Sequence, residues 1–176
     1  MISVTLSLFK GCYRQALPVF FIFIASFAAR AQDEWIDYVV AKDTGVLSVS
    51  MDLKYYVQKP NYKNLLIVGT EFRPCMKNGF PVPDSLDGLF SFSDSTAAVI
   101  NSVTRNELVG ILTYKCLAFD VYYVKDTLGI RENLGTMMQR GFENSELYLT
   151  LKLDRNWDYY FMNLLPVNLS EDFLID

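Results

Sequence analysis

Hydrophobic and polar positions alternate along much of the chain and predict a series of β-strands. In residues 47–54, Leu, Val and Met alternate with Ser, Asp and Lys, and a period of two is typical of a half-buried strand. Residues 35–40 are rich in aromatic and β-branched side chains and predict a preceding strand, joined to the next by a turn at 43–45. The more continuous apolar run of residues 64–72 predicts a third strand inside the sheet.

Helical spacing of apolar residues appears at three places further along. Residues 73–91 carry several prolines and glycines and predict a long connection. A first helix is expected to follow from Ser93, as the N-cap, to about residue 104. A second helix is expected over residues 127–141, with apolar side chains at i, i+4, i+7 and i+8 and Gly141 as its stop. Residues 157–165 return to helical spacing before a proline.

Three further strands complete the predicted order of elements. Residues 107–113 and 118–125 predict a hairpin, and Leu alternates with other residues in the last strand, 147–153. The order is ββ, then β-α-β-β-α-β, then a short helix. We therefore predict an α+β fold: a ferredoxin-like antiparallel sheet with two helices on one face, extended by an N-terminal β-hairpin and a short C-terminal helix.

The start of the chain has the pattern of a secretory signal peptide. Lys10 and Arg14 precede the apolar stretch 16–28, and Ala29-Arg30-Ala31 has the small-x-small pattern of a cleavage site. A retained membrane anchor is the alternative, but the uncharged run 15–29 is shorter than the about 20 residues that a membrane-spanning helix needs. We expect cleavage near Ala31.

The predicted signal peptide determines the expected domain bounds and the expected location of the protein. We predict a signal peptide at 1–31, a single α+β domain at 32–168 and a C-terminal tail at 169–176. The product is expected to be exported, either periplasmic or extracellular, with membrane contact only through the signal peptide before cleavage. Without that segment 13 Lys and Arg face 20 Asp and Glu, a net charge of −7, which disfavours binding to nucleic acid.

The absence of histidine excludes several kinds of active site. The chain has no histidine, so Ser-His-Asp, Cys-His and His-metal chemistry are all ruled out. Gly129 and Gly135 occur singly, so no phosphate-binding glycine loop is indicated. We therefore expect no cofactor and no metal, assign no catalytic residue, and consider an enzyme less favoured than a non-catalytic protein.

Two cysteines, Cys75 and Cys116, remain after the predicted cleavage. An even pair in an exported chain permits a disulfide, which would stabilise the fold by about 4 kcal/mol in the chain-entropy model. Two unpaired cysteines that pack as small apolar residues are the alternative. Neither cysteine is a strong candidate nucleophile, because no histidine is present to generate the thiolate.

The residues around position 157 are weak candidates for a binding or catalytic site. Asp154, Asp158 and Glu146 offer carboxylates for acid–base work, but Asp154 or Asn156 is better placed to cap the terminal helix. The remaining candidates are aromatic. They could form a platform for a glycan or a peptide, although burial in the core is the simpler interpretation: Trp157, Tyr160 and Tyr123, with Tyr122 and Tyr159 beside them.

The C-terminal part carries a family resemblance. An Asp shortly before Trp157, Tyr160 three residues after it and the Leu-Leu-Pro of residues 164–166 resemble the closing signature of the bacterial domain-of-unknown-function family 695. Other pieces agree in order: Trp35 with Tyr38, Gly79-x-Pro81, and Phe119-Asp120-Val121-Tyr122-Tyr123. The resemblance spans nearly all of residues 33–166.

What the resemblance implies is mainly a fold, since no catalytic residues are established for the family. Some members resemble partners of a ribonuclease E regulator domain of similar ferredoxin-like shape. An exported acidic protein would not easily meet a cytoplasmic RNA-degrading enzyme, so that role is not carried over.

The sequence is compatible with three functions. The leading hypothesis is a non-catalytic binding or structural domain of the bacterial envelope, with an unknown protein or glycan partner. A carboxylate-dependent hydrolase of cell-wall or glycan material, with its acids near Asp154, is the alternative. A regulatory partner of another protein is the third.

Overall fold

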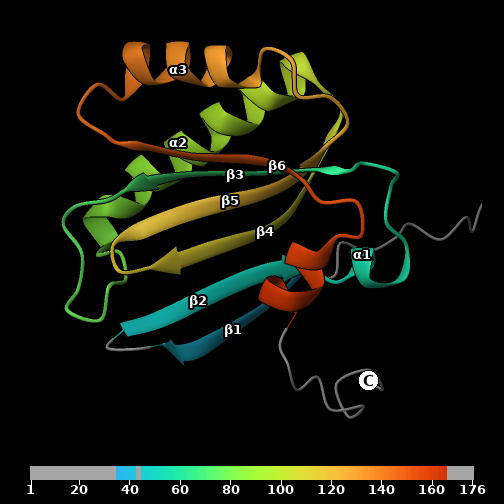
Figure 1. The fold of residues 1–176 in the computed structure, drawn as a ribbon. Helices are drawn as coiled ribbons and strands as arrows, with labels where there is room; N and C mark the ends of the chain where they lie inside the picture. Colours follow the sequence, from blue (N-terminus) through green and yellow to red (C-terminus); the bar gives the residue numbers. More distant parts are fainter. Residues whose placement is uncertain (1–34, 43–44, 166–176) are drawn as a thin grey trace, which may run out of the picture. The chain divides into compact units, whose positions relative to one another are not determined.

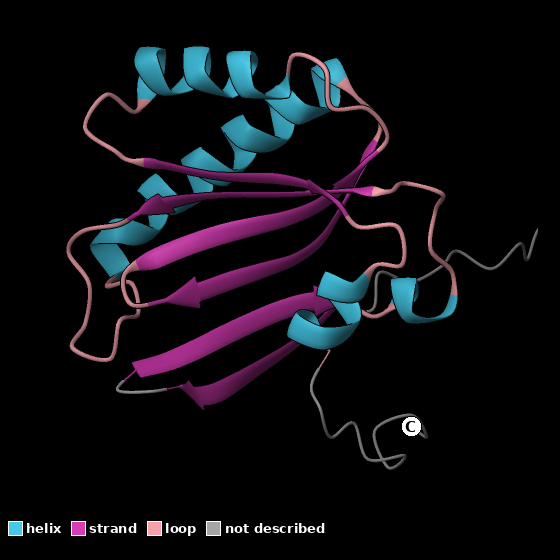
Figure 2. Ribbon diagram, viewed as in Figure 1, coloured by secondary structure: helices cyan, strands magenta, loops and turns pink. Residues whose placement is uncertain are grey.

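The computed structural model describes residues 35–42 and 45–165, and in this part six strands form one antiparallel sheet (Figures 1 and 2). The strands are β1 (Trp35–Lys42), β2 (Gly45–Asp52), β3 (Asn64–Glu71), β4 (Asn106–Tyr114), β5 (Leu117–Val124) and β6 (Leu147–Leu153). Their order across the sheet is β1-β2-β4-β5-β3-β6, and each neighbouring pair is antiparallel. The predicted α+β class is confirmed.

The helices lie on both faces of this sheet. They are α1 (Lys54–Val57), α2 (Pro83–Val103), α3 (Ile130–Gly141) and a π-helical turn, η1 (Tyr160–Leu164). Figure 1 shows α2 and α3 together on one face, whereas α1 and the C-terminal turn lie at the other side, near the ends of β2 and β6. None of the helices in the described ranges is long and apolar enough to cross a membrane.

Each face of the sheet has its own hydrophobic core, because consecutive strand residues point to opposite faces. Tyr122 packs with Phe92 of α2 and Leu134 of α3 in the core on the helix side. Its neighbour Tyr123 packs with Trp157 and other residues in the core on the opposite side. The segment after β6 therefore has a structural task, because it covers the sheet face that α2 and α3 leave open.

Helix α2 begins ten residues earlier than the sequence predicted. Residues 83–91 were expected in a long connection, yet Pro83 is in the first turn of the helix and Asp84 follows it. Proline fits at the first helical position because its missing N–H would have no partner there, and an acidic residue suits the helix dipole. Ser93, the expected N-cap, instead lies in the middle of the helix, and Val82 precedes the first turn.

Local backbone conformations account for the other differences between the predicted and the observed ends of the helices. Helix α3 starts at Ile130, not at residue 127, because Gly129 adopts a left-handed conformation (φ 74°) that ends the preceding segment. Trp157 also has a positive φ, 65°, so the terminal helical residues begin after it. The short helix α1 follows β2 at Lys54, which the alternating pattern had placed in the strand.

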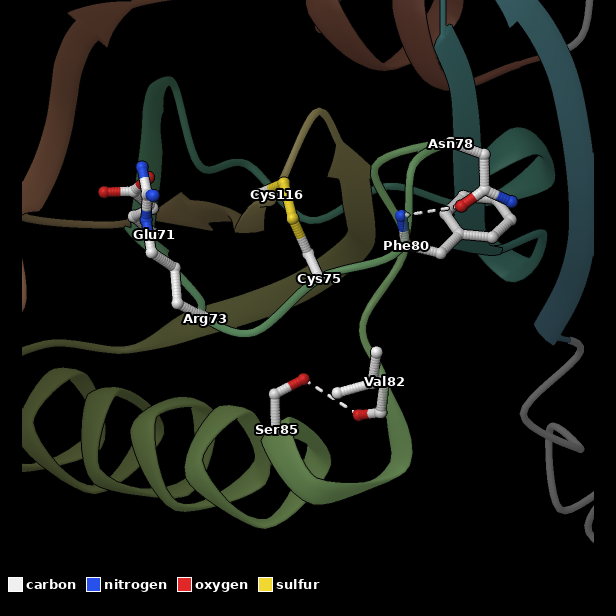
Figure 3. The surroundings of a disulfide bond; sticks show 8 residues. All are labelled: Glu71, Arg73, Cys75, Asn78, Phe80, Val82, Ser85 and Cys116. Atoms are coloured by element: carbon white, nitrogen blue, oxygen red, sulfur yellow. Dashed lines mark hydrogen bonds and ion pairs between the residues drawn. A yellow bond between two sulfur atoms is a disulfide. The ribbon is translucent and has the colours of Figure 1, made fainter.

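The loop between β3 and α2 is joined to the β4–β5 turn by a disulfide between Cys75 and Cys116 (Figure 3). Lys115 and Cys116 both have positive φ values, 48° and 65°, so this tight turn forms without the usual glycine or asparagine. The Cys116 amide donates to the Gly79 carbonyl (2.9 Å), and its carbonyl accepts from Phe72 (2.9 Å). Covalent and hydrogen bonds thus hold the loop against the turn.

The predicted signal peptide and the tail 169–176 lie outside the described residues.

Candidate functional site

Asp154 is a capping residue in the structure. It lies directly after β6 and is 7% exposed. Its Oδ1 accepts a hydrogen bond from the Asp158 amide (2.9 Å), and its Oδ2 accepts one from the Tyr159 amide (2.9 Å) and one from the Tyr123 hydroxyl (2.6 Å). Burial acts to raise the pKa of Asp154, but these three hydrogen bonds outweigh it and hold the pKa below its usual value. The carboxylate therefore fastens the terminal segment.

The aromatic candidates Trp157, Tyr160 and Tyr123 belong to the core. Each is no more than 1% exposed, and the rings of Tyr123 and Trp157 stack with centroids 3.8 Å apart. The Trp157 indole donates to the Tyr62 carbonyl (2.8 Å), and the Tyr160 hydroxyl donates to the Asp52 carbonyl (2.7 Å). A platform for a glycan needs exposed ring faces, so the platform interpretation does not fit these residues.

The three carboxylates considered for hydrolysis do not converge. Glu146 precedes β6 and accepts a hydrogen bond from the Tyr148 hydroxyl (2.9 Å), whereas Asp154 follows the same strand. A seven-residue strand separates them by about 23 Å at roughly 3.3 Å per residue. Asp158 is exposed and contributes its backbone amide to Asp154. This region offers no carboxylate pair for acid–base catalysis.

A different part of the sheet is only partly covered. One row of side chains runs across five strands on the helix side: Asp37, Ser50, Ile111, Asp120 and Val68. Exposure falls along this row. Asp37 is exposed, Ser50 and Ile111 are half-buried, and Asp120 and Val68 are buried. Figure 1 shows the reason, because α2 crosses the sheet over the central strands while β1 and β2 extend beyond it. The edge of α2 therefore borders an open strip of sheet.

A pocket of about 160 Å³ lies at this border, and Asp120 is part of its lining; we call it the Asp120 pocket. Its apolar lining comes from α2 and from the sheet, and includes Leu86, Phe90 and Ile111. Its polar groups are Ser93, Thr113 and Asp120. No lysine or arginine belongs to this lining. A buried carboxyl in a mainly apolar pocket is thus the most distinctive chemical feature of this face.

The surroundings of Asp120 explain its electrostatics. It is 5% exposed, its cross-strand neighbours are Val68 and Ile111, and its Oδ2 accepts a hydrogen bond from the Ser93 hydroxyl (2.7 Å). The Tyr122 hydroxyl lies 3.5 Å from the same oxygen. Burial raises the pKa of Asp120 to about 6, although these hydrogen bonds act to lower it. Asp94 adds a smaller effect in the upward direction through its charge.

A second pocket of about 250 Å³ adjoins the first, and Pro81 and Thr113 belong to both. Its other lining residues are Ser48 on β2 and Met76 and Phe80 on the loop held by the disulfide. We call the two pockets together the α2 groove. Figure 3 shows how the disulfide fixes this loop, where the Phe80 amide also donates to the Asn78 side chain (3.2 Å). One wall of the groove is therefore covalently anchored to the β4–β5 turn.

A third pocket of about 230 Å³ lies on the other side of the first turns of α2. Its charged lining residues include Glu71 and Arg73, whose side chains form an ion pair at 2.5 Å, visible in Figure 3, and Asp84. Arg73 is paired with Glu71 and Asp84 is exposed, so this pocket lacks a buried carboxyl of the kind that lines the Asp120 pocket. In the ranges that the structure describes, no group of three or more acidic or cysteine side chains could hold a metal ion.

Sequence reasoning missed the α2 groove. Asp120 was noticed only as part of a motif, although a signal was present: it interrupts the apolar positions of a strand on the face that carries Ala118 and Tyr122. An acidic residue at such a position faces either solvent or a site. Only the packing of α2 over β5 decides between the two.

Comparison with known proteins gives the family of the chain. The model of a family described as "Family of unknown function (DUF695)" matches residues 33–165. No curated protein matches the chain, and no solved structure does. The matched region includes every strand and helix described above, together with the Asp154 cap and the Asp120 pocket. The chain therefore belongs to the DUF695 family, whose function is unknown.

Proposed function

We propose that this protein is an exported, non-catalytic binding domain of the cell envelope, and that its α2 groove holds a segment of a partner protein. The observation that carries the proposal is the Asp120 pocket. It combines apolar walls, a buried carboxyl and a size suited to one side chain, since typical small-molecule sites are about 300–1,000 Å³. Phe90, which is 63% exposed, extends the apolar surface at its rim.

The arrangement of carboxyls supports binding over hydrolysis. Glycoside hydrolysis needs two carboxyl groups roughly 5–9.5 Å apart on either side of one bond. Asp120 lies on the helix side of the sheet, whereas Asp154 bonds to Tyr123 on the opposite side. Asp120 and Asp154 are therefore separated by the sheet and cannot act on one substrate. Asp154, the acid around which hydrolysis was considered, is bonded to backbone amides.

Two observations support export. The N-terminal segment has the pattern of a signal peptide, and the family match begins after it, at residue 33. The disulfide between Cys75 and Cys116 suits an oxidising compartment, since reducing conditions in the cytosol keep most thiols free. N-terminal sequencing of protein recovered from envelope and cytosolic fractions tests this part. Recovery from the cytosol with Met1 intact would contradict it.

We also propose that the segment from β3 to β6 is a ferredoxin-like unit, extended by the β1–β2 hairpin. The strand order β4-β5-β3-β6 and the packing of α2 against α3 on one face support this assignment. The assignment concerns architecture alone, because many functions share this fold.

Site-specific crosslinking in intact cells tests the binding role. A photoreactive phenylalanine analogue at position 90 should crosslink a protein partner, because this side chain borders the groove. The same analogue at Leu128, which is 89% exposed and outside the groove lining, is the matched control. A bulky Thr113→Trp substitution should reduce the crosslinks from position 90. Equal crosslinking from positions 90 and 128, or none from position 90, would refute the role of the groove.

A further inference from the structure

The Asp120 carboxyl has one oxygen available for a ligand. The Ser93 hydroxyl donates to Oδ2, and the Tyr122 hydroxyl lies closest to that same oxygen. Within the described residues, Oδ1 accepts no hydrogen bond. The side chain is nevertheless 95% buried and belongs to the pocket lining. Oδ1 is not among the fully shielded side-chain oxygens without a partner in the described residues, so it keeps contact with the open space of the pocket, where a ligand can supply a donor.

The charge around the pocket favours a cationic donor. The other acid whose charge acts on Asp120 is Asp94, and the cross-strand neighbours Val68 and Ile111 carry no charge. No basic side chain belongs to the lining of the Asp120 pocket. A positively charged group entering the pocket would meet a carboxylate in apolar surroundings, where a charge-assisted hydrogen bond is stronger than in water.

The hydrogen bonds already made to the Asp120 carboxylate favour lysine over arginine as its ligand. Arginine binds carboxylates best through two parallel hydrogen bonds, which require both oxygens. The Ser93 and Tyr122 hydroxyls both donate to Oδ2, so a guanidinium cannot pair with both oxygens and a ligand is left to contact Oδ1. Lysine carries a compact ammonium on a flexible apolar stem, which can lie along apolar walls such as Leu86 and Ile111. A volume of about 160 Å³ suits one such side chain.

We propose that Asp120 binds the ammonium of a lysine side chain that the partner segment inserts into the Asp120 pocket. This inference rests on the proposed binding function and adds the residue that the partner must present. Thr113 lines both pockets, so we expect the partner's backbone to pass it on the way from the Asp120 pocket along the groove.

Titration of the purified protein with capped pentapeptides tests the inference. The three probes carry lysine, norleucine or arginine at the centre and alanine elsewhere, and the amide signals of Ser93 and Asp120 report binding by NMR. We expect the lysine peptide to bind about tenfold more tightly than the norleucine peptide, whose stem has the same length without the charge. Equal affinity of these two peptides, or tighter binding of the arginine peptide, would overturn the inference.

Two substitutions separate a specific contact from a general negative potential. Asp120→Asn keeps the shape of the side chain and should weaken the lysine peptide about tenfold, whereas Asp94→Asn removes an exposed acid one residue after Ser93 and should change affinity less than about twofold. Equal weakening by both variants would overturn the proposal. A third variant, Ile111→Lys, places an internal ammonium beside Asp120 and should abolish the tighter binding of the lysine peptide relative to the norleucine peptide.

The pH dependence gives an independent check. The titratable groups near Asp120 are Asp94 on α2 and Tyr122 on β5, and burial raises the pKa of Tyr122 far above neutrality. Loss of lysine-peptide binding as the pH falls through about 6 would therefore report protonation of Asp120. Binding that does not change between pH 5 and 8 would overturn the inference.

The proposed function and this inference fail in different ways. If the groove binds a partner without lysine, crosslinks from position 90 persist unchanged in the Asp120→Asn variant, and only the lysine inference falls. If the groove binds no partner, crosslinks from position 90 are absent in the wild-type protein.

Discussion

Replacing Asp120 with asparagine should make the protein more stable at neutral pH, although the change removes a buried, hydrogen-bonded carboxyl. The pKa of Asp120 rises from 3.8 to about 6 in the folded protein, mainly through burial. Between these two values the folded state holds more protons than the unfolded state. Wild-type stability therefore decreases as the pH rises from about 4 to about 6, and the full penalty remains above pH 6.

The size of the stability change follows from the pKa values of Asp120 in the unfolded and folded protein. An increase of about 2 in pKa corresponds to about 3 kcal/mol of free energy, at about 1.4 kcal/mol for each unit. Asparagine carries no charge, so it avoids this cost, and its carbonyl can still accept the hydrogen bond from Ser93. Its NH₂ group lacks a partner in the pocket, which costs about 1–2 kcal/mol. We expect a net gain of about 1–2 kcal/mol at pH 8 and a loss of similar size at pH 4.

Urea unfolding followed by tryptophan fluorescence measures this effect, because the buried Trp157 becomes exposed on unfolding. The free energy of unfolding is compared for wild type and Asp120→Asn at several pH values between 4 and 8, with Asp94→Asn as the control for an exposed acid. The difference between wild type and Asp120→Asn should change by about 3 kcal/mol across this range. A difference that does not vary with pH would show that Asp120 is not buried as described.

Three further predictions concern the architecture. Asp154→Ala removes the acceptor of three hydrogen bonds and should cost about 3–5 kcal/mol, against about 1–2 kcal/mol for Tyr123→Phe, in urea unfolding at pH 7. Because the folded pKa of Asp154 is lowered, this contribution is complete above its ordinary pKa and disappears in acid, so equal losses at pH 3 and pH 7 would contradict the cap. Replacing Cys75 and Cys116 together with serine should cost about 4 kcal/mol for a separation of 41 residues, and an unchanged Tm under oxidising conditions would argue against the bond. Gly69→Ala places a Cβ against the ring of Phe119 and 2.7 Å from the Ala118 carbonyl oxygen, and should lower stability by about 1–3 kcal/mol. A neutral result would indicate that both the ring and this backbone segment move aside freely.

Local pattern was sufficient where one short-range rule controlled the structure. Strict alternation from Leu147 to Leu153 predicted β6 with the bounds that the structure shows. The capping interpretation of Asp154 also followed from its position before a helical segment, and the core interpretation of Trp157 from its apolar spacing. In these cases neighbours in sequence are also the neighbours that determine the conformation.

Local pattern was insufficient where signals conflicted. Pro83 and Gly88 can both belong to a loop, and this interpretation moved the expected start of the first helix to Ser93. In the structure Pro83 begins the helix, and burial of Ser85 and Phe92 against the rest of the fold stabilises its first turns. Tertiary packing can offset a glycine in a helix, whose cost is only about 1 kcal/mol.

The amino-acid sequence alone determined the class of fold, the order of most elements and the family, because hydrophobic periodicity and short aromatic motifs are properties of neighbouring residues. The candidate site depended on the tertiary structure. Asp120 and Ser93 are 27 residues apart, and nothing near either residue specifies that α2 crosses the sheet above β5. The helix covers Asp120 and leaves β1 and β2 open beside it, so the same strand pattern produces a buried carboxyl and a groove only after these distant segments pack together.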